Sequence, residues 1–176
     1  MAKTAATQNK IITLAGVVLA LVFVVGAQLT AWGNRFADST VHDQLVQEKI
    51  YFPKAGDRAL DPKEFPGLQQ YAGTQVDSGP KAKAYANEFI WAHMMEASGG
   101  KTYAEVSTAA SANPKNAKLA ALKTTLFQGD MLRSSLLTAY AFSVFGAIAG
   151  YATLVLYALA ILALLTALVT LMMRHR

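Results

Sequence analysis

Residues 11–30 read IITLAGVVLALVFVVGAQLT, a run of twenty positions in which Thr13, Gln28 and Thr30 are the clearly polar ones. A helix rises about 1.5 Å per residue, so this run is about 30 Å long, which matches the hydrocarbon thickness of a bilayer. Trp32 follows where an aromatic residue marks a membrane interface. The sequence therefore predicts a transmembrane helix over residues 11–33.

A cleaved signal peptide is the alternative interpretation of this run, with Val25-Gly26-Ala27 as its small-residue cleavage site. However, the apolar core of a signal peptide usually has about 7–15 residues, and this run is longer. We therefore expect an uncleaved span that is preceded by a short cytoplasmic segment, residues 1–10.

A second run, residues 134–173, contains no Asp, Glu, Lys or Arg. As one helix it would be about 60 Å long, twice what a bilayer needs. A hairpin of two short spans would have to turn within 146–150, which lacks the Pro, Asn or Asp of a usual turn. We favour one long helix over 131–173, with a membrane part at about 148–173 and a first part, 131–147, that packs on the domain or on a partner.

Gly146 and Gly150 form a small-xxx-small pair in this helix, and Ala160, Ala163 and Ala167 continue the supply of small residues. Small side chains let two helix backbones approach closely in lipid, which gives no hydrophobic drive for association. We predict that Gly146 and Gly150 are helix-packing residues whose partner is either the first span or another subunit. The alternative is that Gly and Ala are simply common in membrane helices.

Charged residues are concentrated between the two apolar runs. All 11 acidic residues lie from Asp38 to Asp130, and the four basic residues outside the middle of the chain are at its ends, namely Lys3, Lys10, Arg174 and Arg176. Short cytoplasmic segments that flank membrane spans are rich in Lys and Arg. We therefore expect a plasma-membrane protein with both ends in the cytoplasm, including a tail at 174–176, and with residues 34–130 outside.

The composition excludes several classes of protein. Hydrophobic residues make up 53% of the 176 positions and charged residues 15%, whereas a soluble domain carries about 25% charged residues. The formal charge of +5 is explained by the expected topology. Nucleic-acid binding is not predicted, because the sequence has no basic stripe with interleaved aromatic residues. With no cysteine, the chain has no disulfide, thiol chemistry or cysteine-bound cluster of its own.

Local signals in residues 34–130 indicate short helices. The end of the first helix continues outward over 34–48, and Ile50-Tyr51-Phe52-Pro53 is an extended piece. Asp61-Pro62-Lys63-Glu64 has the form of a helix start, with Asp as N-cap and Pro at the first helical position. This predicts an all-α membrane protein, in which two transmembrane helices flank a small extracytoplasmic helical domain with a marginal core.

Three further helix boundaries are visible in the second half of this domain. A helix over about 80–97 ends at Gly99-Gly100, and Thr102-x-x-Glu105 is a capping box for a helix to about Ala112. Asn113-Pro114 starts another helix, which we expect to close at Gly129, with Asp130 as the N-cap of the long terminal helix.

Candidate chemical groups are few. Asp38 and His42 are four residues apart, and His93 and Glu96 are three apart, with Glu88 nearby in sequence. A metal site needs three or four converging ligands, and Met94 and Met95 beside His93 are typical of a hydrophobic core. The remaining histidine, His175, lies in the basic tail.

Other catalytic patterns are incomplete. Gly99-Gly100-Lys101-Thr102 ends like a phosphate-binding loop, but Met95 stands where that loop needs its first Gly. Neither apolar run contains an ionisable Asp, Glu, Lys, Arg or His, so a transport pathway is not expected. We predict no catalytic, cofactor-binding or metal-binding residue and no enzyme activity, with a metal-dependent enzyme as the least favoured alternative.

Three stretches carry a resemblance, namely Tyr51-Phe-Pro-Lys-Ala-Gly, Leu60-Asp-Pro-Lys-Glu-Phe-Pro-Gly-Leu-Gln-Gln-Tyr-Ala-Gly73, and Gly79-Pro-Lys-Ala-Lys-Ala-Tyr-Ala-Asn-Glu-Phe-Ile-Trp-Ala-His93. The chain resembles a group of uncharacterised two-span membrane proteins of actinobacteria. Some members of that group are labelled as aromatic ring-opening dioxygenases, which are soluble, metal-dependent enzymes. The resemblance implies two spans and an actinobacterial source, and it carries over no site residue.

These observations together predict a non-catalytic accessory or structural subunit of a larger integral membrane complex, for example a respiratory one. Its expected partners are other integral membrane subunits and the lipid bilayer. The alternative is a membrane-anchored binding protein for a hydrophobic ligand or an envelope lipid.

Overall fold

The computed structural model describes residues 2–174, with side chains from residue 7 to residue 173. Its regular elements are all helical, as predicted, and the two longest are α1 (Ala2–Gln47) and α5 (Ala117–Arg174). The chain divides into two compact units. We call Met1–Ala37 with Phe145–Arg176 the helical pair, and Asp38–Val144 the middle unit.

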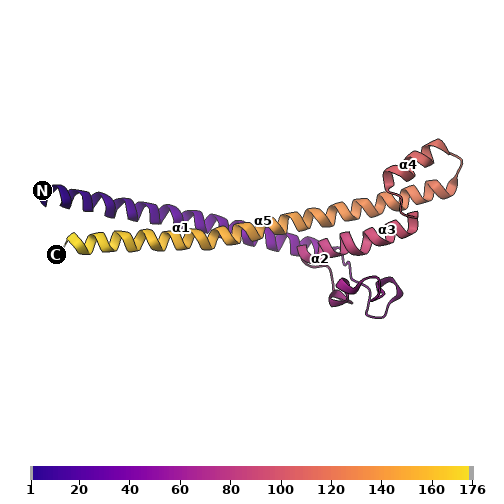
Figure 1. Cartoon of the computed structure of the whole chain (residues 1–176), viewed down its shortest axis with the longest axis horizontal. Coiled ribbons are helices and arrows are strands. Elements are labelled where there is room, and N and C mark those ends of the chain that lie inside the picture. The colour runs from indigo at the N-terminus through magenta and orange to yellow at the C-terminus, as the bar shows by residue number, and fades with distance from the viewer. Residues whose placement is uncertain (1, 175–176) are drawn as a thin grey trace. The chain divides into compact units, whose positions relative to one another are not determined.

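In the helical pair, α1 and α5 run antiparallel and side by side (Figure 1). The hydroxyl oxygens of Thr13 and Thr170 are 2.9 Å apart, and those of Thr30 and Thr153 are 2.8 Å apart. Residue numbers therefore rise along α1 as they fall along α5, and the two ends of the described chain lie together. Both helices are long and apolar enough to cross a membrane.

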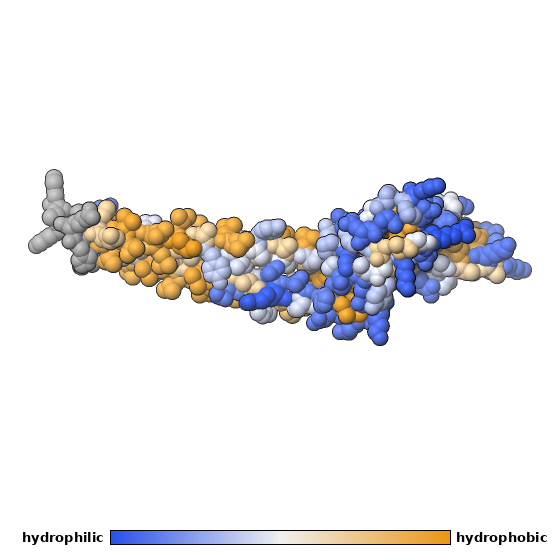
Figure 2. Space-filling view, turned by 90° about the horizontal axis from the view of Figure 1, so that it is seen from below, coloured by the Kyte–Doolittle hydropathy of each residue, from blue (hydrophilic) through white to orange (hydrophobic). Residues whose placement is uncertain are grey.

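Small residues form the contact between the two helices. A Cβ atom added to Gly16 would lie 3.0 Å from the carbonyl oxygen of Ala163 and 3.0 Å from the Cβ of Ala167. Further alanines are buried along the same contact, namely Ala20, Ala27 and Ala160. Leu, Val and Ile side chains cover the outside of the pair, which Figure 2 shows as an apolar surface.

The stretch 134–173 is one continuous helix, because α5 runs from Ala117 to Arg174 without a turn. The predicted helix end at Gly129 and new start at Asp130 are therefore wrong. A Cβ added to Gly129 would lie 2.6 Å from the Sδ atom of Met94, so this glycine gives room for packing and does not stop the helix. Asp130 pairs with Arg133 one turn later, at 3.3 Å.

Two other predicted helix starts differ from the structure. After Asp61 the chain makes an isolated turn, because Pro66 disfavours helical backbone at Phe65, and the 3-10 helix η2 (Pro66–Tyr71) follows. α5 starts three residues later than Asn113-Pro114 would place it. The side chain of Asn116 accepts a hydrogen bond from the Leu119 amide at 3.1 Å and caps the helix.

The middle unit has a helical segment built of α2 (Gly79–Ala84), the π-helix η3 (Tyr85–Ile90) and α3 (Trp91–Ser98). It ends at Gly99, which has a left-handed φ of 63°, as the sequence predicts. The predicted capping box of Thr102 and Glu105 opens α4 (Tyr103–Ala112). Between α1 and α2 lie η1 (Arg58–Leu60), η2 and an isolated antiparallel bridge between Tyr51 and Gln75.

The core of the middle unit has two clusters. The larger one joins the end of α1, the loops and α2 to α5, through Val41, Leu45, Phe52, Leu60, Phe65, Leu68, Val76, Ala82, Ala84, Ala86 and Leu136. The smaller one joins α3 and α4 to α5, through Met94, Val106 and Leu126. These contacts fix the parts of α1 and α5 that belong to the middle unit relative to each other.

Candidate functional site

The predicted helix-packing residues lie against α1. Gly146 is buried, and its carbonyl oxygen accepts a hydrogen bond from Asn34 Nδ2 at 2.8 Å. A Cβ added to Gly150 would lie 3.2 Å from the same Nδ2 atom. In this chain the two glycines therefore face α1, and the α1 residue that they contact is Asn34.

Polar contacts between the two helices were not predicted from the sequence. Besides the two threonine pairs, Gln28 Nε2 donates to the hydroxyl of Tyr157 at 2.7 Å. A signal was present in the spacing, because Thr13, Thr30 and Asn34 fall on the face of α1 that also carries Gly16 and Ala27. Such bonds satisfy polar groups inside an apolar layer and fix the register of the two helices.

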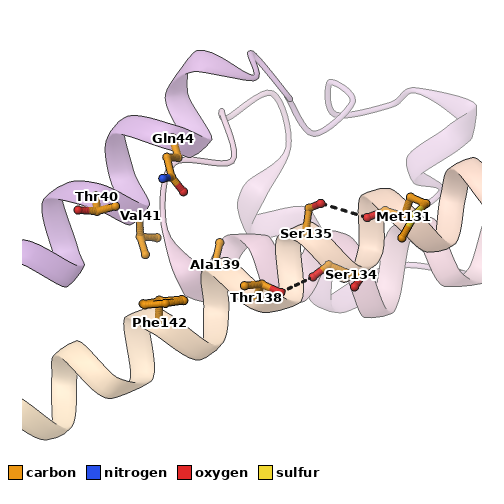
Figure 3. Close-up of a pocket in the computed structure, with 9 residues that line it drawn as sticks. All are labelled: Thr40, Val41, Gln44, Met131, Ser134, Ser135, Thr138, Ala139 and Phe142. Carbon is orange, nitrogen blue, oxygen red and sulfur yellow. Dashed lines mark hydrogen bonds between the residues drawn. The ribbon is translucent and has the colours of Figure 1, made fainter.

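A groove lies in the middle unit between the end of α1 and α5 (Figure 3). Its volume is about 370 Å³, and its lining residues are all uncharged: Thr40, Val41, Gln44, Met131, Ser134, Ser135, Thr138, Ala139 and Phe142. Phe142, Val41 and Ala139 give it an apolar part. Its α5 residues fall within 131–147, for which a packing role was predicted, but the sequence did not single out this set.

The polar groups of the groove differ in their bonding. Ser135 and Thr138 donate to carbonyl oxygens of their own helix, at 3.2 and 2.9 Å. The side chains of Thr40, Gln44 and Ser134 have no hydrogen-bond partner among the described residues. The groove therefore offers neutral hydrogen-bonding groups around an apolar surface, and it has no general acid, base or metal ligand.

His93 lies in an aromatic stack in the middle unit. Its ring is parallel to that of Phe65, with a centroid distance of 5.4 Å, and 4.4 Å from that of Phe89. Its Nδ1 is 2.8 Å from the carbonyl oxygen of Phe89, so that nitrogen carries a proton and donates it. Burial also raises the pKa of Tyr85, which packs against Phe89, above its ordinary value of 10.0.

A polar hollow of about 680 Å³ lies beside His93, and it is bordered by Asp57, Arg58, Ala59, Asp61, Glu64 and Glu96. The structure thus places Glu96 near His93, as the spacing suggested, and adds three carboxylates from the preceding loop. Even so, no three His, Cys, Asp or Glu side chains converge as metal ligands anywhere in the described part of the chain.

The other candidate groups do not assemble into a site. His42 is exposed, and its Nδ1 donates to the carbonyl oxygen of Asp77 at 3.0 Å. The Gly99–Thr102 segment ends one helix and caps the next. His175 lies outside the described residues.

No family model, curated protein or solved structure matches the chain. The resemblance to the actinobacterial group therefore stays a prediction.

Proposed function

We propose that the chain is a two-span membrane protein that serves as a non-catalytic contact subunit of a larger membrane complex. In this proposal the helical pair crosses the bilayer, both ends of the chain lie in the cytoplasm, and the middle unit lies outside. The partners are other integral membrane subunits.

The burial pattern of the helical pair supports the membrane part of the proposal. In the most apolar part of each long helix, 17% of the residues are buried. A core helix of a soluble protein would be mostly buried. A helix that crosses a bilayer instead exposes its apolar side chains to the lipid chains around it. The antiparallel pairing also brings the beginning of α1, where Lys10 lies, to the same end of the pair as the end of α5 at Arg174, as the charge rule requires.

An uncovered apolar stripe on α5 carries the contact part of the proposal. Within the middle unit, Phe127, Met131 and Phe142 are 49%, 50% and 54% exposed, and their spacing places them on one face of the helix. The opposite face is packed into the core through Leu126 and Leu136. Ser135 and Thr138 lie between Met131 and Phe142 on the same face, and exposed large apolar side chains of this kind mark a place of contact.

The chemistry of the groove favours contact over catalysis. The stripe borders the groove, whose lining residues are all uncharged (Figure 3).

One specific observation favours the second candidate function, the binding of a small amphipathic lipid. The groove volume of about 370 Å³ is within the range of small-molecule sites, about 300–1,000 Å³.

The test compares two equally exposed aromatic residues. Phe142→Ser removes the apolar surface of the stripe, and Tyr51→Ser removes a ring that is also 54% exposed but lies on the extended piece far along the chain. Tagged chains are purified in mild detergent, and the recovered membrane proteins are quantified. Near-equal amounts of a defined integral membrane protein should accompany the parent chain and the Tyr51→Ser variant, and should be lost from the Phe142→Ser variant.

Two results would count against a contact subunit. Recovery of the parent chain without any stoichiometric protein would overturn it. A bound lipid in mass spectra of the parent chain, lost in the Phe142→Ser variant, would establish the second candidate in its place.

A further inference from the structure

Aromatic side chains mark one level along the helical pair. Trp32 is 62% exposed, and its ring stacks on that of Phe36 at a centroid distance of 5.5 Å. On α5, Tyr151 is 72% exposed. The bond between Asn34 and Gly146 places these parts of α1 and α5 close together along the pair. Exposed Trp and Tyr at one level of a membrane protein mark the headgroup layer.

A small hollow lies at this level between the two helices. Its volume is about 290 Å³, and it is bordered by Ala31, Asn34, Arg35, Gly150 and Thr153. The amide of Asn34 and the hydroxyl of Thr153 already donate to backbone carbonyls, at 2.8 and 2.9 Å. Because Gly150 has no side chain, the side of the hollow formed by α5 stays open.

Arg35 is the residue at the hollow whose side-chain hydrogen-bond donors are available to a ligand. Its side chain is exposed and makes no hydrogen bond or ion pair with the residues that the structure describes. The ion pairs within those residues join Lys81 to Asp77 and Arg133 to Asp130. Residues 11–34 and 134–173 carry no charge, so Arg35 is the first charged residue after the apolar run of α1, and Asp38 follows it three positions later.

We infer that this hollow binds the phosphate of an anionic phospholipid headgroup through Arg35. A guanidinium offers a planar fork of donors that matches two phosphate oxygens, and it is less strongly hydrated than an ammonium group. The other side chains that border the hollow are neutral, and the nearest acidic residue in sequence is Asp38, one turn further along α1. The inference rests on the membrane placement in the proposed function, but not on the contact role of the middle unit.

Quenching of Trp32 by brominated lipids tests the inference in the full-length chain. The chain has two tryptophans, so a Trp91→Phe background leaves Trp32 as the sole reporter, one turn from Arg35. The protein is reconstituted in phosphatidylcholine vesicles that contain brominated phosphatidylglycerol or brominated phosphatidylcholine. We expect about a fivefold preference for phosphatidylglycerol near Trp32, as one cation at a membrane surface gives.

Matched variants identify the group responsible. Arg35→Gln should bring the preference to about one, whereas Lys10→Gln, which removes a cation from the other end of the same span, should leave it unchanged. Equal quenching by both lipids in the parent chain, or an unchanged preference in Arg35→Gln, would overturn the site while leaving the membrane placement intact. Loss of the preference on adding inorganic phosphate would assign the site to the free ion and overturn the lipid. Absence of any quenching would show that the membrane placement itself fails.

Discussion

Asn34 in α1 donates a hydrogen bond from Nδ2 to the carbonyl oxygen of Gly146 in α5, at 2.8 Å. Replacing Asn34 with Leu removes this bond and places a branched side chain against Gly150, where an added Cβ would already lie 3.2 Å from the Asn34 amide. We expect the free energy of unfolding in mixed micelles to fall by about 1 kcal/mol. Leu29→Ala, on the exposed side of α1, is the control and should change it much less.

The close approach of the two helices at Gly16 makes a second, stronger prediction. A side chain at Gly16 would press on Ala163 and Ala167, whereas a Cβ added to Gly33 meets no atom within 4 Å. Gly16→Val should lower the free energy of unfolding by about 1–3 kcal/mol, the usual cost of overpacking. The control is Gly33→Val, which has the same effect on helix propensity and should leave the free energy of unfolding nearly unchanged. Equal effects of the two substitutions would contradict this packing.

The features that the sequence predicted correctly are those set by local chemistry. The two apolar runs, the helix stop at Gly99 and the capping box at Thr102 depend on residues close together in the chain. Gly129 shows the limit of such reasoning, because its neighbour Met94 is far away in sequence and turns an apparent stop into a packing position. The bond from Asn34 to Gly146 could not be predicted because its acceptor is a backbone oxygen on another helix.

The groove could not be predicted from the sequence either. Its residues come from the end of α1 and from a part of α5 that are about ninety positions apart, and both segments pack into a shared core through Val41 and Leu136. Neutral Ser and Thr residues carry no distinctive pattern of their own. The spacing of Phe127, Met131 and Phe142 was the signal that the sequence offered for this surface, because it places three large apolar residues, all exposed in the structure, on one helix face.

The capping box at the start of α4 makes the stability of that helix depend on pH. The Thr102 backbone amide donates to Glu105 Oε2 at 2.7 Å, and this bond, followed by that from the Thr102 hydroxyl, lowers the pKa of Glu105 below its ordinary value of 4.5. Because the folded-state pKa is depressed, the stabilisation is fully present above pH 4.5 and is lost as the pH falls through the folded-state pKa.

Amide hydrogen exchange in the first turn of α4 measures this effect. Protection at Val106, whose amide bonds to the Thr102 carbonyl at 3.0 Å, should decrease as the pH falls below 4.5, once the intrinsic exchange rate is taken into account. In Glu105→Gln the amide keeps a neutral acceptor for the cap, so protection should be lower at neutral pH and nearly independent of pH. The same pH dependence in this variant would show that another group is responsible.

His93 is expected to stabilise the middle unit by packing and not by binding a metal. Its ring contacts the rings of Phe65 and Phe89, and its Nδ1 donates a hydrogen bond to a backbone carbonyl. His93→Ala should lower the free energy of unfolding by about 1–2 kcal/mol, since two ring contacts are lost. Addition of Zn²⁺ should leave the melting temperature of the parent chain unchanged.

The exposed His42 gives a control, because His42→Ala should lower the free energy of unfolding by less than about 0.5 kcal/mol. If Zn²⁺ raised the melting temperature of the parent chain and not of His93→Ala, the carboxylates beside His93 would be metal ligands, and the prediction of a non-catalytic protein would lose its basis.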